Sequence, residues 1–392
     1  MTSICPKKQC TGCTACMNSC PHAAIMMKSD ASGFMYPSIT QEACVNCGIC
    51  AKVCPVNHPV KLELPHSCYA VTVDNEEELL SCSSGGAATA ISKHVIREGG
   101  VVFGCSGEDP RNVCHIRVGK IEDLYKLKGS KYVQSDLSET FQQVKEDLLH
   151  LPKVLFVGTP CQVAGLKSFL RRDYVNLLTI DLVCHGVPSQ KMLTDNLNRY
   201  SGEDGVAQVS FRRKNVRLNL PRIEFGWEYK GLDRQNTIFK PYNKDYYMFG
   251  FLRCLIFREN CYICAYARNE RVGDLTLCDF WGLQPDAGFE TGKGVSAVLV
   301  NSEKGVLFFN AVKDEIIWKE RQVSEATKWN EQLNHPCQMP KRYRRFLRLY
   351  GGLPFSIAMW RAYYKDYLCD CYVNYKNDLK LFLFKHGIIK NL

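Results

Sequence analysis

The chain has 392 residues, of which 46% are hydrophobic and 23% charged. This composition excludes a largely disordered chain, and the length favours two or three domains. The net charge is +10, and residues 341–392 contribute +8 of it, from eleven Lys or Arg against three Asp. The other 340 residues are therefore close to neutral. This excludes a globally basic nucleic-acid binder, so no nucleic-acid partner is expected.

The N-terminal sequence MTSICPKKQC contains neither an apolar core nor a small-residue cleavage site, and no stretch reaches about 18 uncharged apolar residues. We therefore expect a cytoplasmic protein without a transmembrane segment. The chain contains 22 cysteines. In a reducing compartment, clustered cysteines are metal ligands or redox groups before they are disulfides.

One cysteine pattern occurs twice near the N-terminus, as Cys10-x2-Cys13-x2-Cys16-x3-Cys20-Pro21 and as Cys44-x2-Cys47-x2-Cys50-x3-Cys54-Pro55. Thiolates spaced in this way suit [4Fe–4S] clusters, and in bacterial ferredoxin spacing the fourth cysteine of each run ligates the other cluster. We therefore assign Cys10, Cys13, Cys16 and Cys54 to one cluster, and Cys20, Cys44, Cys47 and Cys50 to the second. A pair of zinc sites is the alternative, but zinc sites usually have a longer spacer.

Two short strands are expected between the runs, over 24–28 and 33–39. Gly12 and Gly48 allow backbone amides to approach the cluster sulfurs, and the prolines after each run prevent helix continuation. Residues 1–60 are thus predicted to form an α+β dicluster ferredoxin-like domain. Cys5 lies outside both runs and receives no role.

Downstream, strand-like segments alternate with helical ones. Apolar segments at 68–72, 99–104, 153–158 and 177–183 predict strands, and this alternation indicates an α/β fold. The segment Ser83-Ser84-Gly85-Gly86 opens an apolar helix predicted over 87–96. Its glycines could let amides face a phosphate, but the same pattern also occurs as a plain helix cap.

Further motifs follow in the order GSKYVQ (129–134), GTPCQ (158–162), VCHGVP (183–188), Cys261-x2-Cys264 and CDFWG (278–282). With the SSGG segment, their order over residues 68–310 resembles the beta subunits of coenzyme F420 hydrogenases and dehydrogenases and their stand-alone bacterial relatives. Many relatives also carry a ferredoxin module ahead of this region. Residues 61–340 are therefore predicted to form a mixed α/β flavin-binding domain of this family.

The resemblance implies bound FAD and an additional [4Fe–4S] cluster. We expect the third cluster to be held by Cys161, Cys184, Cys261 and Cys264. The alternative is that Cys161 and Cys184 are buried core thiols. The candidate flavin contacts are Ser83, Ser84, Gly85, Gly86, Lys131, Tyr132, Val133, Gln134, Gly158, Thr159, Pro160 and His185.

Other cysteines of this region lack ligand spacing. Cys105, Cys114, Cys254 and Cys278 are interpreted as core or surface thiols. Cys82 is interpreted in the same way unless it lies over the flavin as a redox-active thiol. No residue singles out coenzyme F420 as a substrate, and no catalytic residue is assigned.

Residues 341–392 combine basic and aromatic residues and are predicted to form a short helical tail. The first interpretation is that its helices pack aromatic side chains on the flavin domain and expose a basic face. The alternative is a basic patch for an acidic partner or an anionic membrane surface. Cys369 and Cys371 have too short a spacing to indicate a metal site.

These features predict an iron–sulfur, flavin-dependent oxidoreductase. It would pass electrons between a ferredoxin-type carrier, the clusters and FAD, for two-electron reduction or oxidation of a small-molecule substrate, because clusters exchange single electrons and flavin can transfer hydride. Two alternatives are a non-catalytic electron-relay subunit of a larger complex and an accessory protein of a surface-polysaccharide pathway. An anaerobic host is expected, because such clusters are oxygen-sensitive.

Overall fold

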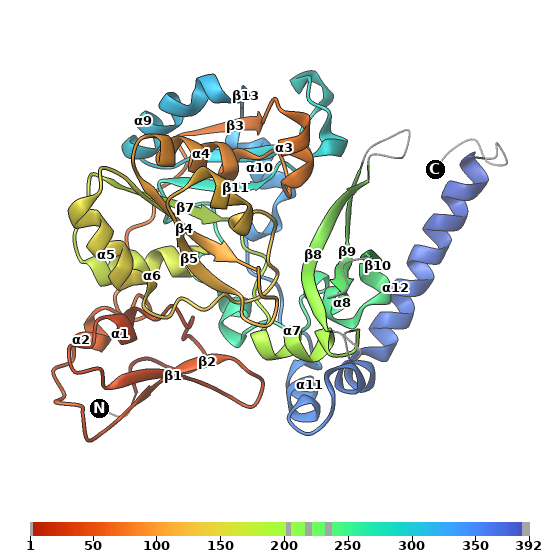
Figure 1. Cartoon of the computed structure of the whole chain (residues 1–392). Coiled ribbons are helices and arrows are strands. Elements are labelled where there is room, and N and C mark those ends of the chain that lie inside the picture. The colour runs from red at the N-terminus through yellow and green to blue at the C-terminus, as the bar shows by residue number, and fades with distance from the viewer. Residues whose placement is uncertain (1–2, 201–204, 216–221, 232–236, 386–392) are drawn as a thin grey trace.

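The computed structural model describes residues 3–200, 205–215, 222–231 and 237–385. Figure 1 shows three parts: a small N-terminal domain, a central layered domain, and a third part that contains a small sheet and the long C-terminal helix. The last residues of the predicted tail, 386–392, lie outside the described residues.

The N-terminal domain is built around a two-stranded antiparallel sheet, with β1 at Ile25–Ser29 and β2 at Met35–Ile39. Each cysteine run contains a four-residue helix, α1 at Ala15–Asn18 and α2 at Ile49–Lys52. The residue before each helix, Thr14 or Gly48, has a left-handed backbone, with φ of 62° and 74°. The sequence duplication is therefore also a structural duplication, and both predicted strands are present.

The central domain contains a mixed sheet in the order β13-β3-β12-β11-β7-β6-β4-β5, eight strands among the residues described. Strands β4, β6, β7 and β11 are parallel neighbours, and the outer pairings are antiparallel. This confirms the predicted α/β class. The bounds are β3 Ser67–Thr72, β4 Val101–Ser106, β5 Cys114–Val118, β6 Val154–Gly158, β7 Leu177–Leu182, β11 Leu275–Asp279, β12 Ser296–Val300 and β13 Ile317–Arg321.

Helices cover both faces of this sheet, which explains why its inner strands are nearly continuous apolar runs. Phe141 of α5 and Leu166 of α6 share one apolar core with Phe156 of β6. Ile91 of α4 and Phe309 of α9 share another core with Leu155. The bounds are α3 Glu76–Ser81, α4 Ala87–Arg97, α5 Thr140–His150, α6 Pro160–Leu170, α9 Glu303–Val312 and α10 Val323–Trp329.

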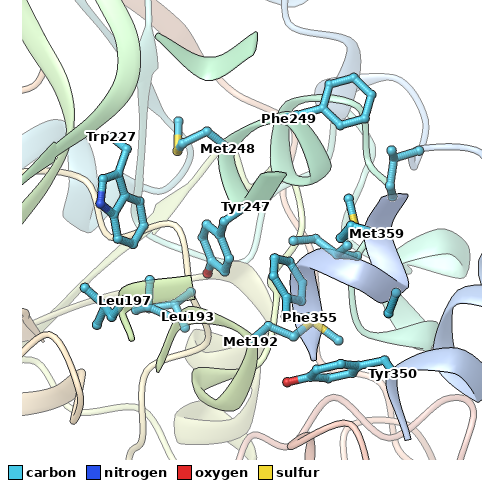
Figure 2. Close-up of a cluster of buried hydrophobic side chains, with 14 of the residues drawn as sticks. Met192, Leu193, Leu197, Trp227, Tyr247, Met248, Phe249, Tyr350, Phe355 and Met359 are labelled. Atoms are coloured by element: carbon cyan, nitrogen blue, oxygen red, sulfur yellow. The ribbon is translucent and has the colours of Figure 1, made fainter. Parts of the chain in front are cut away.

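The third part has its own aromatic core (Figure 2). Strands β8, β9 and β10 form an antiparallel sheet, and helices α7, α8, α11 and α12 pack beside it. Trp227 of β9, Tyr247 of α8 and Phe355 of α12 are all buried in this core. The bounds are β8 Val206–Asn215, β9 Arg222–Gly231, β10 Thr237–Pro241, α7 Gln190–Leu197, α8 Tyr246–Leu252, α11 Tyr343–Tyr350 and α12 Phe355–Lys385.

The segment predicted as a basic tail is part of this core. Phe346, Tyr350 and Tyr363 are buried, whereas Arg344 and Arg348 on α11 are exposed. On α11 the aromatic residues therefore pack inward and the basic ones face outward, as the first interpretation of the sequence expects, whereas the later part of α12 also exposes aromatic side chains. None of the helices described is both long enough and apolar enough to span a membrane.

Candidate functional site

Cys20, Cys44, Cys47 and Cys50 line one cavity in the N-terminal domain, with about 370 Å³ of open space. Three of them come from the second run and one from the first. The structure therefore brings together the four cysteines that the ferredoxin spacing assigns to one cluster. A cavity lined by four thiols has the soft donor set that an iron–sulfur cluster requires.

The second cavity holds the other predicted set, Cys10, Cys13, Cys16 and Cys54, around about 350 Å³. Cys5 lines it as well, although it lies outside both cysteine runs. Hydrogen bonds from Cys5 lower the pKa of the Cys10 thiol to about 6 and that of Cys54 to about 7.

The other two thiols of this second cavity behave differently. Burial raises the pKa of Cys13 to about 11 and raises that of Cys16 further. Bound iron would reverse this effect, because a coordinating thiol is deprotonated.

The third cavity lies in the central domain and has about 550 Å³ of open space. Cys161, Cys184, Cys261 and Cys264 all line it, as the predicted third cluster requires, and Cys337 does so too. Burial raises the pKa of the four predicted cluster ligands, to about 12 for Cys184. The donor set fits a [4Fe–4S] cluster for the same reason as in the first two cavities.

The fold places two of these cysteines at the C-terminal edge of the parallel strands, and the other two lie in the segment between α8 and β11. Cys161 lies in the first turn of α6, directly after β6, and Cys184 follows β7. A capping box fixes the start of α6: Gln162 accepts a hydrogen bond from the Thr159 amide, and Pro160 occupies the first helical position. Thr159 and Pro160, predicted as flavin contacts, line the third cavity, whereas Gly158 packs against the Phe156 ring.

The second and third cavities are neighbours. Thr11 lines both of them. Cys13 packs on α6 so closely that a side chain at Gly165 would meet the Cys13 sulfur at 2.9 Å. The absence of a side chain at Gly165 therefore lets the N-terminal domain lie directly against the helix that carries Cys161.

Arg258 joins the same two domains. It is fully buried, and its guanidinium donates to the carbonyl oxygens of Cys10 at 2.8 Å and Met35 at 2.9 Å, and to Gln134 Oε1 at 3.2 Å. The Gln134 amide in turn donates to Thr11 O at 2.9 Å. Gln134, predicted as a flavin contact, is thus engaged with the ferredoxin domain. Within the described ranges, Arg258 forms no ion pair with a carboxylate.

A buried ion pair, Arg271 with Asp181, holds the segment of chain that follows Cys264 in place. Arg271 donates to Asp181 Oδ1 at 2.9 Å, and both side chains are fully buried. The second oxygen of Asp181 accepts from the Val272 and Gly273 amides at 3.0 and 2.9 Å. Removing one partner of such a buried pair typically costs about 3–5 kcal/mol. This network fixes the chain between Cys264 and β11.

The SSGG segment lies beside the strand β3. A side chain on Gly85 would meet Val71 O at 2.1 Å, so Gly85 is needed for close packing against the sheet. Gly86 is the N-cap of α4, with φ 88°. The Ser83 hydroxyl accepts a hydrogen bond from the Ser130 amide at 2.7 Å, and this bond joins SSGG to the GSKYVQ segment.

Two lysines lie at the junction between the SSGG and GSKYVQ segments. Lys214 Nζ donates to Ser84 O at 2.7 Å, and Lys131 Nζ donates to the carbonyl oxygens of Leu127 and Lys128. Burial lowers the pKa of each lysine to about 8. Neither pairs with a carboxylate in the part of the chain that the structure describes. Two desolvated cations without such a counter-charge fit the phosphates of a dinucleotide such as FAD.

The remaining predicted flavin contacts spread from this junction toward the third cavity. Tyr132 stacks on Phe251 at 4.2 Å and contacts Arg212. A single nitrogen of Arg212, Nη1, donates to both carboxylate oxygens of Asp279 in the CDFWG motif. Val133 is buried in the aromatic core of the third part. His185 lines the third cavity and lies 5.2 Å from the Phe251 ring.

Several residues of these sites were missed by sequence reasoning, namely Cys5, Asp181, Arg212, Lys214, Arg258, Arg271 and Cys337. The position of Cys5 five residues before the first run was the only sequence signal among them. The others act through contacts between segments far apart in the chain, which spacing does not reveal.

The N-terminal fold and its two cavities define a dicluster iron–sulfur domain, here fused to an α/β domain. Residues 9–58 match the 4Fe-4S dicluster domain, and residues 151–326 match the family described as the C terminus of the coenzyme F420 hydrogenase/dehydrogenase beta subunit. Residues 151–326 are thus similar to this beta-subunit family, and the iron–sulfur domain precedes them in the chain. Iron–sulfur clusters and a redox role follow from these two matches.

Two curated proteins are similar over most of their length. One is an uncharacterized protein, MJ1349, of Methanocaldococcus jannaschii, 24% identical over 77% of this chain and 86% of its own. The other is the F subunit of the F(420)H(2) dehydrogenase of Methanosarcina mazei, 23% identical over 78% of this chain and 83% of its own. Among solved structures, a chain of the F420-reducing [NiFe] hydrogenase complex from Methanosarcina barkeri matches with a TM-score of 0.45 and 19% identity, over 69% of this chain and 91% of its own.

Proposed function

We propose that this protein is an iron–sulfur flavoprotein oxidoreductase that passes electrons between a ferredoxin-type carrier and FAD, for a two-electron reaction of a small-molecule substrate. The observation that carries this proposal is the set of three cysteine-lined cavities, of which the second and third share Thr11. Clusters in these cavities would exchange single electrons, and FAD would exchange one or two.

The residues of the chain have distinct roles in this proposal. The twelve cysteines hold the clusters, and Arg258 and Gln134 hold the ferredoxin domain against the central domain. Lys131 and Lys214 supply positive charge to the FAD phosphates, beside the SSGG segment. Thr159, Pro160 and His185 lie on the third cavity and would contact the flavin only on the side facing that cluster.

One observation favours the second candidate, a non-catalytic relay subunit. Helix α12 exposes apolar and aromatic side chains at helical spacing, including Trp360, Tyr364, Leu368, Tyr372 and Tyr375. Such a stripe on a projecting helix suits docking to a redox partner (Figure 1). The M. mazei relative is by name one subunit of a dehydrogenase, which agrees with this alternative.

The test is electron transfer in protein purified without air. Dithionite-reduced ferredoxin is mixed with the full chain, and the absorbance of the clusters and of the flavin is followed by stopped-flow. We expect bleaching of the clusters first and of the flavin afterwards. Clusters that bleach in a protein containing no flavin would favour the relay subunit, and protein without iron would contradict both candidates.

The two buried lysines predict a pH dependence of FAD binding. Because burial lowers their pKa to about 8, from 10.5 in the unfolded chain, they lose their charge as pH rises through 8. FAD phosphates stabilise the charged forms, so affinity should fall between pH 8 and 10, with proton uptake on binding. By the same linkage, the FAD-free protein should gain stability from pH 8 to 10.5. Equilibrium titration of apoprotein with FAD at several pH values measures the first effect.

A pair of matched variants distinguishes the titration of the buried lysines from other effects of pH on FAD affinity. In Lys214→Met the fall in FAD affinity with pH should be shallower, whereas Lys240→Met on β10 should behave as the unmodified chain does. An affinity that does not change between pH 7 and 10 would contradict the placement of the phosphates.

A further inference from the structure

Three side chains, His185, Cys254 and Cys337, form a cluster beside the third cavity, and their ligand atoms all lie within 4.8 Å of one another. The iron–sulfur proposal gives the two cysteines no role. They come from three separate segments: the loop after β7, the end of α8, and the loop before α11. A thiol pair with an imidazole is a donor set that binds divalent thiophilic metals.

The distances suit a single metal ion. Cys254 Sγ lies 3.5 Å from His185 Nε2, and the thiols of Cys254 and Cys337 are hydrogen-bonded to each other. With Zn–S bonds of about 2.3 Å and Zn–N bonds of about 2.0 Å, sulfur and nitrogen ligands of a tetrahedral zinc are about 3.5 Å apart. The distance between Cys254 Sγ and His185 Nε2 therefore matches one edge of a zinc tetrahedron.

The backbone at Cys254 indicates that its side chain is needed. Cys254 has φ 55°, the left-handed conformation in which glycine is favoured after a helix. The Tyr262 hydroxyl donates to Cys254 O at 2.7 Å and holds this conformation. A residue with a strained backbone, held in place by its neighbours, points to a functional side chain.

The arrangement does not suit two other uses of these thiols. Ligands of a [4Fe–4S] cluster bind different corners of the cube, so two sulfurs in direct hydrogen-bond contact are too close to be ligands of one cluster. Cys337 lines the third cavity, but its sulfur pairs with Cys254. Both cysteines are free thiols in the structure rather than a disulfide.

We propose that His185, Cys254 and Cys337 bind one zinc ion, which ties the loop before α11 to the end of α8 beside the third cavity. The Gln332 amide donates a hydrogen bond to Cys337 Sγ at 3.8 Å and lines the same cavity. The ion would fix the chain where the central domain continues into α11 and α12. None of the three zinc ligands is among the four cysteines assigned to the third cluster, although His185 and Cys337 line the same cavity and His185 directly follows Cys184. With zinc bound, His185 is a metal ligand and does not contact the flavin.

The test measures zinc and iron in protein purified without air and replete in iron. We expect one zinc per chain, and X-ray absorption at the zinc edge should show two sulfur and at least one nitrogen neighbour. An iron-replete protein without zinc would overturn the proposal. So would zinc with four sulfur neighbours, which would place it in a cysteine-only cavity, or a Cys254–Cys337 disulfide found by mass spectrometry after thiol trapping.

Single substitutions test whether Cys254 and Cys337 are the zinc ligands. Cys254→Gly should fold, because glycine is favoured at this φ, and should lose the zinc while keeping all of its iron. Cys337→Ser should lose zinc in the same way, and Cys369→Ser on the exposed face of α12 should keep both metals. Loss of iron from Cys337→Ser would instead make Cys337 a cluster ligand and overturn the proposal.

Discussion

Replacing Cys261 by Ser should remove about four of the roughly twelve iron atoms that three [4Fe–4S] clusters would hold. The serine hydroxyl is a poor ligand for these clusters, and Cys261 is one of four predicted ligands that line the third cavity. The N-terminal clusters should remain, because their eight cysteines lie in two other cavities. Iron and sulfide analysis of anaerobic protein, with electron paramagnetic resonance of the reduced clusters, measures the loss.

The same variant should also slow electron transfer from the N-terminal clusters to the flavin. Reduced ferredoxin should still bleach the N-terminal clusters, and reduction of the flavin should be much slower than in the unmodified chain. Cys114→Ser is the control, since Cys114 lies on β5 and lines none of these three cavities. Unchanged iron in Cys261→Ser would show that the third cavity does not hold a cluster.

The grouping of the N-terminal cysteines around two cavities could be predicted almost completely from sequence, because ligand spacing in a short loop is local information. In the structure, Cys54 lies with the cysteines of the first run and Cys20 with those of the second run, as the ferredoxin spacing implies. The α/β class and strands such as β6 and β7 were also predictable, since buried parallel strands are continuous apolar runs. The grouping of Cys161 with Cys261 depended on the resemblance to the family, because 100 residues separate them.

Other features depend on contacts between distant segments, and no local pattern reports those. Nothing near Arg258 in sequence reveals that its guanidinium bonds to Cys10 O, 248 residues away. Gly85 illustrates the opposite problem. Its place before a helix suggests a phosphate loop, whereas the structure shows close packing against β3 as its first requirement. A bulky residue at Gly85 would therefore disturb the sheet and would not test flavin binding.

The second large effect concerns the reduction potential of the cluster predicted in the second cavity. Arg258 places a buried positive charge at the carbonyl of Cys10, and this charge also helps to lower the Cys10 pKa. A cluster gains negative charge on reduction, so a nearby cation raises its potential. Two unit charges that are about 5 Å apart at an effective dielectric constant of about 20 interact by about 3 kcal/mol, which for a one-electron reduction is on the order of 100 mV. Arg258→Met should therefore lower this potential by about that amount.

Redox titration followed by electron paramagnetic resonance measures the shift, and the first cavity provides an internal control. The cluster of Cys20, Cys44, Cys47 and Cys50 lies away from Arg258, so its potential should change far less. Arg258→Lys keeps the charge but loses the planar fork that reaches Cys10, Met35 and Gln134 together. It should keep most of the potential while weakening the contact between the domains. If Lys and Met shifted the potential equally, the effect would come from lost hydrogen bonds and altered packing, and the charge would not be its cause.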